Sequence, residues 1–149
     1  MTSASNSADD NKAVVRRIPN EIMTEGVDTA IEEVFAADFV EHNPTLGEIH
    51  GPDGFRNRVY KPLRDAFSDL EVVIEELIAE DNRVVLRATI HGIHEGEFND
   101  IEATGNTIEV PVMVIHRVED GLVAERWVIF DALSMMQQLD VIPNPPDAT

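Results

Sequence analysis

The spacing of apolar residues changes once along this chain, and that change restricts the folds it can adopt. Up to about residue 67 the apolar residues recur every three or four positions, which is the spacing of one helix face. Beyond it they alternate or run together, as in half-buried and buried strands. The helical stripes predicted in the first part are Val14, Val15, Ile18 and Ile22; Val27, Ile31, Val34 and Phe35; and Phe55, Val59, Leu63 and Phe67.

Local signals give these helices expected ends. Ser7, with Asp10 three positions later, is typical of a capping box at the start of the first helix. Pro19 is expected to kink or split that helix, because proline cannot donate the helical hydrogen bond. Asp28 is expected to cap the second helix, and residues 38–44 read as a short extended piece that stops at a proline.

The second part of the chain predicts strands over 70–80, 83–94, 107–119 and 122–131, followed by a short helix over 132–139. Asp120-Gly121 is the strongest hairpin signal, and Asp81-Asn82 marks another tight turn. Because the helices come before the strands and do not alternate with them, we predict an α+β fold with helices packed on a curved antiparallel sheet.

The chain has 149 residues, 43% of them apolar, which suits one domain with a substantial core. We expect a disordered N-terminal segment over 1–10, a domain over 11–143 and a flexible tail over 144–149. There is no cysteine, no apolar run long enough for a membrane span and no basic-then-apolar leader, so the expected location is the cytoplasm.

The formal net charge is −18, from 29 acidic and 11 basic residues spread along the chain. Such a surface repels nucleic-acid phosphates and anionic membranes, so neither is an expected partner. Only two of the basic residues are lysines, Lys12 and Lys61. This skew resembles proteins adapted to concentrated salt, in which screening weakens self-repulsion, and we expect molar KCl to raise the stability of the protein.

Taking Asp120-Gly121 as a two-residue turn places Glu119 opposite Leu122 and fixes the register of the last hairpin. One face would then carry the opposite pairs His116 with Glu125, Val114 with Trp127, Val112 with Ile129, and Val110 with Asp131. This face is apolar at its centre and ionisable at its ends, so it is predicted to form a pocket wall. Alternatively, it is plain core whose polar ends reach solvent.

Five histidines are present, at positions 42, 50, 91, 94 and 116. His91 and His94 are three residues apart on a predicted strand, so they point to opposite faces and cannot chelate one ion. No His-Glu-x-x-His or calcium-loop motif occurs, and we predict no metal site. His116 opposite Glu125 predicts a cross-strand pair about 20 Å from Asp131.

Several stretches, in order, then point to a known family. They are Phe39-Val-Glu-His-Asn-Pro44, Ile49-His-Gly-Pro-Asp-Gly54, His91-Gly-Ile-His-Glu-Gly-Glu-Phe98, Val118-Glu-Asp-Gly121, Glu125-Arg-Trp127, Phe130-Asp131 and Met136-Gln-Gln-Leu139. In this order and spacing they resemble the SnoaL-like polyketide cyclase family, which has the nuclear-transport-factor-2-like fold. The resemblance spans residues 12–143. It implies a cone-shaped barrel of N-terminal helices on a curved sheet with an internal pocket.

The resemblance also implies a chemistry and a set of residues. Well-known members close a ring by intramolecular aldol condensation with an aspartate as general acid/base, without metal or cofactor. By this resemblance Asp131 is the expected acid/base and His42 a second donor or proton carrier. The expected substrate-binding residues are Trp127, His94, Val112, Val114 and Ile129. Residues 126–130 contain no carboxylate, and Asp131 directly precedes the last helix, so it can equally be a helix cap alone.

Three functions stay open at this point. The first is a cofactor-independent enzyme for a small carbonyl or polyketide-like ester, and the second is a non-catalytic binding module for a small hydrophobic molecule on the same scaffold. A third, ketosteroid-isomerase-like activity, is weakened because the only tyrosine, Tyr60, lies on a predicted helix. Members of the scaffold commonly pair through the outer sheet face, so we expect a homo-oligomer held by Leu122, Ala124, Val128 and Phe130.

Overall fold

The computed structural model describes residues 7–143, and it contains five α-helices, two π-helical segments and six strands over this range. The helical elements are α1 (Ala8–Arg17), η1 (Ile18–Thr24), α2 (Ala30–Val34), α3 (Gly51–Phe55), η2 (Arg56–Tyr60), α4 (Lys61–Ala66) and α5 (Ala132–Gln138). The strands are β1 (Phe35–Asn43), β2 (Gly47–His50), β3 (Phe67–Glu80), β4 (Arg83–His94), β5 (Thr107–Glu119) and β6 (Leu122–Phe130).

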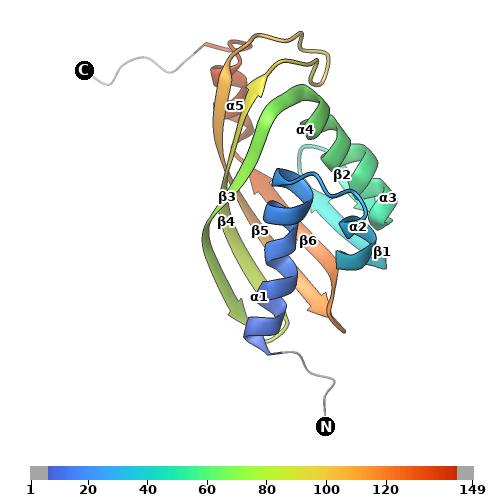
Figure 1. Cartoon of the computed structure of the whole chain (residues 1–149). Coiled ribbons are helices and arrows are strands. Elements are labelled where there is room, and N and C mark those ends of the chain that lie inside the picture. Colours follow the sequence, from blue (N-terminus) through green and yellow to red (C-terminus); the bar gives the residue numbers. More distant parts are fainter. Residues whose placement is uncertain (1–6, 144–149) are drawn as a thin grey trace, which may run out of the picture.

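The strands form one curved sheet in the order β2-β1-β6-β5-β4-β3, and α1 to α4 lie on its concave side (Figure 1). Neighbouring strands are antiparallel except β1 and β6, which run parallel. The predicted α+β fold of helices on a curved sheet is therefore confirmed, although the sheet is mixed and open. The expected strand boundaries of β4 and β5 are also confirmed, whereas β2 was not predicted.

The start of the domain follows its sequence signals closely. Ser7 accepts a hydrogen bond from the Asp10 amide at 3.0 Å, and both arms of the capping box are present. Because α1 begins at Ala8, the segment expected to be disordered over 1–10 is helical from residue 8. Pro19 does end the regular helix, which widens into η1 at Ile18. Residues 1–6 of that segment, and the tail expected over 144–149, lie outside the described residues.

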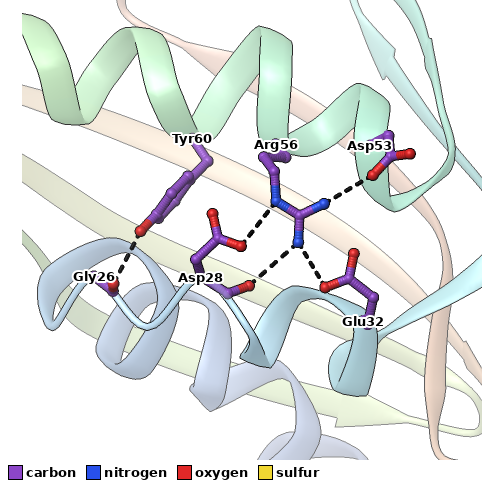
Figure 2. A network of polar contacts seen from close by, with 6 residues as sticks. All are labelled: Gly26, Asp28, Glu32, Asp53, Arg56 and Tyr60. Carbon is purple, nitrogen blue, oxygen red and sulfur yellow. Dashed lines mark hydrogen bonds and ion pairs between the residues drawn. The ribbon is translucent and has the colours of Figure 1, made fainter.

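A polar network joins the helices above the sheet (Figure 2). The expected helix cap at Asp28 is wrong, because its carboxylate instead accepts from Arg56 Nε at 3.0 Å. The same guanidinium binds Glu32 and Asp53, at 2.6 and 2.8 Å. Nearby, the Tyr60 hydroxyl donates to the Gly26 carbonyl at 2.9 Å. The single tyrosine therefore ties η2 to the turn that follows η1 and does not reach into the cavity described below.

The last hairpin corrects the predicted register. Asp120 and Gly121 both have positive φ, 52° and 79°, as a tight hairpin turn of this type requires. Glu119 pairs with Leu122 as expected, but Ala124 is an extra residue on β6 and forms a β-bulge. Beyond it the pairs shift by one position, so that Ile115 and not Val114 lies opposite Trp127. Every β6 side chain after the bulge therefore points to the face opposite the expected one.

The two faces of the sheet differ in burial. On β5, buried and exposed residues alternate along nearly the whole strand, and the buried set faces the helices. The opposite, outer face exposes large apolar side chains: Met113 at 57%, Ile115 at 42% and Ile129 at 67%. The expected outer residues Val128 and Phe130 lie on the inner face instead, because of the bulge. Within residues 7–143, no helix is long and apolar enough to cross a membrane.

Candidate active site

A cavity of about 150 Å³ lies between the helices and the inner face of the sheet. Apolar side chains make up most of its wall. They are Ile18, Pro19, Met23, Leu46, Phe55, Val59, Pro62, Leu63, Val72, Leu86, Ile90, Phe98, Val112, Val114, Val128, Phe130 and Met135. The polar residues of the wall fall into two groups, a buried one (Glu41, Asn43 and Arg126) and an exposed one (Thr45, Arg58 and Asn99). A cavity of this composition suits a small, largely apolar organic molecule.

The buried polar group centres on an ion pair between neighbouring strands. Glu41 on β1 lies directly opposite Arg126 on β6, and Arg126 Nη1 donates to Glu41 Oε1 at 2.9 Å. The two side chains are only 1% and 8% exposed. Removing two charges from water is costly, so such a pair in an apolar cavity wall calls for a functional explanation more than a structural one.

The turn at the end of β1 braces the carboxylate. Alternation along β1 turns both Glu41 and Asn43 inward, and Asn43 Nδ2 lies 3.4 Å from Glu41 Oε2. Asn43 Oδ1 accepts hydrogen bonds from the Thr45 and Leu46 amides at 3.0 and 3.2 Å. These bonds fix the orientation of the Asn43 amide, whose nitrogen then faces the carboxylate.

Arg126 is held from two further sides. Its guanidinium lies over the Phe55 ring, 5.4 Å from the ring centroid. Burial lowers the pKa of the Arg126 guanidinium and the charge of Glu41 raises it, yet an arginine remains protonated in such surroundings. Its Nε is buried without a hydrogen-bond partner among the described residues, which leaves donor capacity on this side chain.

His116 lies opposite Arg126 on the inner face, so the predicted cross-strand pair of His116 with Glu125 is wrong. The ring is fully buried, and its Nδ1 lies 3.2 Å from the Val84 carbonyl, which can only accept. Burial holds the pKa of His116 well below its ordinary value, and the charge of Arg126 lowers it further. His116 is therefore neutral, with its proton on Nδ1 and a free acceptor at Nε2.

This buried histidine gives a prediction for stability against pH. The unfolded chain binds a proton on His116 near pH 6.5 while the native state does not, so stability is lost as pH falls below about 6.5, by up to about 1.4 kcal/mol per pH unit. Urea unfolding of wild type and His116→Gln from about pH 7.5 to 5 measures the difference. The variant is expected to lose less stability on acidification, and exposed His50→Gln is expected to behave as wild type. Equal slopes for all three proteins would contradict this assignment.

The arrangement can carry out acid/base chemistry. A carboxylate in a dry cavity can accept a proton from a carbon acid, and a fixed guanidinium can stabilise the oxyanion that forms. Among the described residues, no group of three or more His, Asp or Glu side chains is placed to hold a metal ion.

The structure brings two of the sequence-predicted binding residues into the cavity, Val112 and Val114. Trp127 and Ile129 point to the outer face because of the bulge, and neither lines the cavity. Outside the cavity, Trp127 stacks on His42 with ring centroids 5.5 Å apart, and the Arg83 guanidinium lies over its ring.

His42 also lies on the outer face, since its neighbours Glu41 and Asn43 on β1 point inward. His42 Nε2 and Glu125 Oε2 are 2.6 Å apart, and Arg117 Nε donates to the other oxygen of Glu125 at 3.0 Å. The hydrogen bond with His42 holds the pKa of Glu125 below its usual range against the opposing effect of burial. The structure therefore places His42 in an ion-pair cluster outside the cavity.

Asp131 and His94 both have other partners. Asp131 is exposed and caps α5, where its Oδ1 accepts from the Ser134 amide at 3.0 Å. His94 is fully buried beside Phe67, and its Nδ1 accepts from the Thr104 amide at 3.2 Å. Neither residue belongs to the cavity wall. The catalytic role expected for Asp131 remains a prediction.

Sequence reasoning missed Glu41, Asn43 and Arg126. All three sit in stretches that carried the family resemblance, but the residues predicted from those stretches were their neighbours His42 and Trp127. The alternation of β1 makes Glu41 and Asn43 partners on one face, and this was a usable signal. No sequence signal revealed that Arg126 faces inward, because that depends on the bulge at Ala124.

Comparisons with known proteins agree with this architecture. The family model described as SnoaL-like polyketide cyclase matches residues 13–139. A protein from Jannaschia sp. CCS1, assigned as a SnoaL-like polyketide cyclase, has 23% identity and a TM-score of 0.83, with 96% of this chain and all of that chain covered.

Two Streptomyces proteins are also similar. IdmH from Streptomyces antibioticus, assigned as a polyketide cyclase, has 25% identity and a TM-score of 0.77 over 87% of this chain and 98% of its own. AclR from Streptomyces galilaeus, assigned as a hydroxylase, has 24% identity and a TM-score of 0.83 over 95% and 87%. Among proteins with curated descriptions none matches. Since the family model covers most of the chain, the protein belongs to the SnoaL-like polyketide cyclase family.

Proposed function

We propose that the protein is a cofactor-independent enzyme that removes a proton next to the carbonyl group of a small polyketide-like ester or ketone bound in the cavity. The enolate formed in this step then either attacks a second carbonyl carbon of the same molecule, which closes an aldol ring, or is reprotonated at another position, which gives an isomer. The observation that carries the proposal is the buried pair of Glu41 and Arg126 in the wall of an otherwise apolar cavity. The family to which the chain belongs, and relatives assigned as polyketide cyclases, support this class of substrate.

In this proposal Glu41 is the general base and Arg126 the oxyanion-stabilising residue. A carboxylate oxygen of Glu41 takes the proton from the carbon beside the carbonyl. The electron pair of that C–H bond forms a carbon–carbon double bond, and the π pair of the carbonyl moves to its oxygen. As Glu41 becomes neutral, the charge of Arg126 is freed to pair with the enolate oxygen. The negative charge thus moves only within reach of one fixed guanidinium, which limits the reorganisation that the reaction requires.

The test is exchange of carbon-bound protons in D2O, followed by NMR with β-keto esters and diketones as probes. Wild type is expected to accelerate exchange at the carbon between or beside the carbonyls. Val59→Trp fills the wall of the cavity at a half-buried position and is expected to abolish the acceleration. The matched control Ile78→Trp, on an exposed strand position outside the cavity, is expected to retain it. Equal acceleration by both variants would exclude the cavity as the reaction site.

A second candidate is a non-catalytic binding module for small hydrophobic molecules. Two observations favour it: Asp131 is turned to a helix amide, and residues 126–130 contain no carboxylate. The same experiment separates the candidates. A binding module would show probe binding that Val59→Trp removes, without any acceleration of exchange by wild type.

We also propose that the protein forms a homo-oligomer, of which the simplest is a dimer, through the outer sheet face. Met113, Ile115 and Ile129 are exposed there, and the register places Met113 opposite Ile129. Arg83 and Arg117 lie opposite each other on the same face, and Arg117 neutralises Glu119 and Glu125 there, which locally reduces the negative charge that would otherwise oppose self-association.

Light scattering after size exclusion tests this interface. Ile129→Glu is expected to shift the protein to the monomer, because it places a charge in the apolar centre of the face. Leu133→Glu, at a similarly exposed position on α5, is expected to leave the assembly intact. Repeating the runs in low and molar KCl also tests whether salt, by screening the acidic surface, strengthens assembly and stability. A monomer at all concentrations of wild type would contradict the proposal.

A further inference from the structure

The arginines of this acidic chain are mostly committed to carboxylates. Arg17, Arg56, Arg87, Arg117 and Arg126 each form ion pairs with Glu or Asp side chains. Arg58 and Arg64 differ, because both donate to backbone carbonyls: Arg58 to those of Leu46 and Glu48, at 2.8 and 3.4 Å, and Arg64 to those of Met23 and Thr24, at 2.8 and 3.2 Å. Of the two, only Arg58 lines the cavity. A carbonyl oxygen is a dipole and not a counter-charge, so Arg58 keeps its full positive charge without a carboxylate beside it in the described part of the chain.

Arg58 also lies in the cavity wall, at the mouth. Only three lining residues are exposed, Thr45, Arg58 and Asn99, and all three are polar. They mark the side on which the cavity opens to solvent. The bonds from Arg58 to Leu46 and Glu48 anchor the guanidinium over the turn between β1 and β2, so its position at the mouth is fixed.

The cavity therefore has a cation at each end and an apolar section between them. Arg126 lies at the buried end beside Glu41, and Arg58 lies at the exposed end beyond the β1–β2 turn. Asn43 is two residues along β1 from Glu41, about 7 Å, and the turn that Arg58 contacts begins just past it. The turn that Arg58 contacts therefore lies on the order of 10 Å along β1 from Glu41, the residue that Arg126 binds.

We propose that the molecule taken by this cavity carries a carboxylate that binds Arg58 at the mouth, while its carbonyl group reaches Arg126 at the buried end. This inference rests on the proposed function and adds the substrate class: an oxo acid whose two oxygen groups are joined by an apolar chain. Arg58 supplies a planar pair of donors suited to a carboxylate, and Arg126 supplies the oxyanion donor, already balanced by Glu41. A neutral ester of the same molecule lacks the first interaction.

The alternative role for Arg58 is purely structural, in which it only braces the β1–β2 turn. Both roles use the same hydrogen bonds to Leu46 and Glu48, so contacts alone do not separate them. They differ in the ligand they favour, because an arginine that only supports the turn does not distinguish a carboxylate ligand from a neutral one.

The experiment compares 9-oxodecanoate with its methyl ester by calorimetric titration at about 0.1 M salt, where screening still permits a contact ion pair to form. Wild type is expected to bind the acid about tenfold more tightly than the ester, as a charge-assisted hydrogen bond predicts. The Arg58→Gln variant is expected to bind the acid more weakly and the ester as tightly as wild type, so that the two affinities come within about twofold of each other. Arg58→Lys, which keeps the charge, is expected to recover part of the preference.

The control is Arg87→Gln, the same substitution at an exposed arginine on the outer sheet face, which is expected to keep the full preference. Equal binding of acid and ester by wild type would overturn the inference while leaving the proposed cavity function in place, provided that Val59→Trp blocks both ligands. A preference that persists in Arg58→Gln would overturn it as well. Failure of both ligands to bind wild type would count against the inference and the proposed function together.

Discussion

Replacement of Glu41 by Gln is expected to lower the rate of enzyme-catalysed proton exchange by about two to four orders of magnitude, the range that a positioned general base contributes. Gln has nearly the shape of Glu. Its amide oxygen can therefore still accept a hydrogen bond from Arg126 Nη1, which lies 2.9 Å from Glu41 Oε1 in the wild type. What the substitution removes is the basic oxygen. The measurement is the exchange rate of the best probe in D2O at saturating concentration, normalised to folded protein.

The informative control is Asp131→Asn. Asn can replace Asp as a helix cap, so α5 and the amide of Ser134 keep a hydrogen-bond acceptor. If Glu41 is the base, the Asp131→Asn variant catalyses exchange of the probe's protons at close to the wild-type rate, whereas the Glu41→Gln variant does not. The reverse outcome would return the catalytic role to Asp131, as the family resemblance first indicated, and would leave Glu41 with a structural role only.

Much of the fold was predictable because the relevant signals are local. The hairpin at Asp120-Gly121 needs two residues with positive φ, and few dipeptides supply them as readily. The capping box of Ser7 and Asp10 and the break at Pro19 likewise depend on short-range chemistry. The pairing of β1 with β6 is different, because it joins parallel strands more than eighty residues apart, and no short-range pattern encodes which strands become neighbours.

The candidate site was less predictable, and one residue explains most of the difference. Ala124 is the extra residue of a β-bulge, and it reverses the direction of every later side chain on β6. Trp127 and Ile129 thereby exchange faces with Arg126 and Val128. A small residue in a strand is compatible with a regular ladder or with a bulge, so the sequence alone permits both registers. The outcome depends on packing, which buries Val128 and the guanidinium of Arg126 beneath the helices.

Replacement of Arg126 by Met is expected to lower the free energy of unfolding by about 3–5 kcal/mol, the cost of leaving one partner of a buried ion pair without its counter-charge. Met has a similar length and no charge, so it fills most of the space over the Phe55 ring. Glu41 would remain 1% exposed, with only the 3.4 Å contact to Asn43 to replace its bond to Arg126. Urea unfolding of wild type and variant measures the difference.

The double variant Glu41→Leu with Arg126→Met distinguishes a cost of unpaired charge from a cost of poor packing. If unpaired charge dominates, removing both partners restores much of the lost stability, since well-packed apolar side chains often replace a buried ion pair without loss. The loss in the double variant is then clearly smaller than the sum of the two single losses. Additive losses would mean that Glu41 and Arg126 contribute independently. A pair that the fold could replace by apolar side chains, yet retains in the wall of its cavity, is best explained by what it does to a bound molecule.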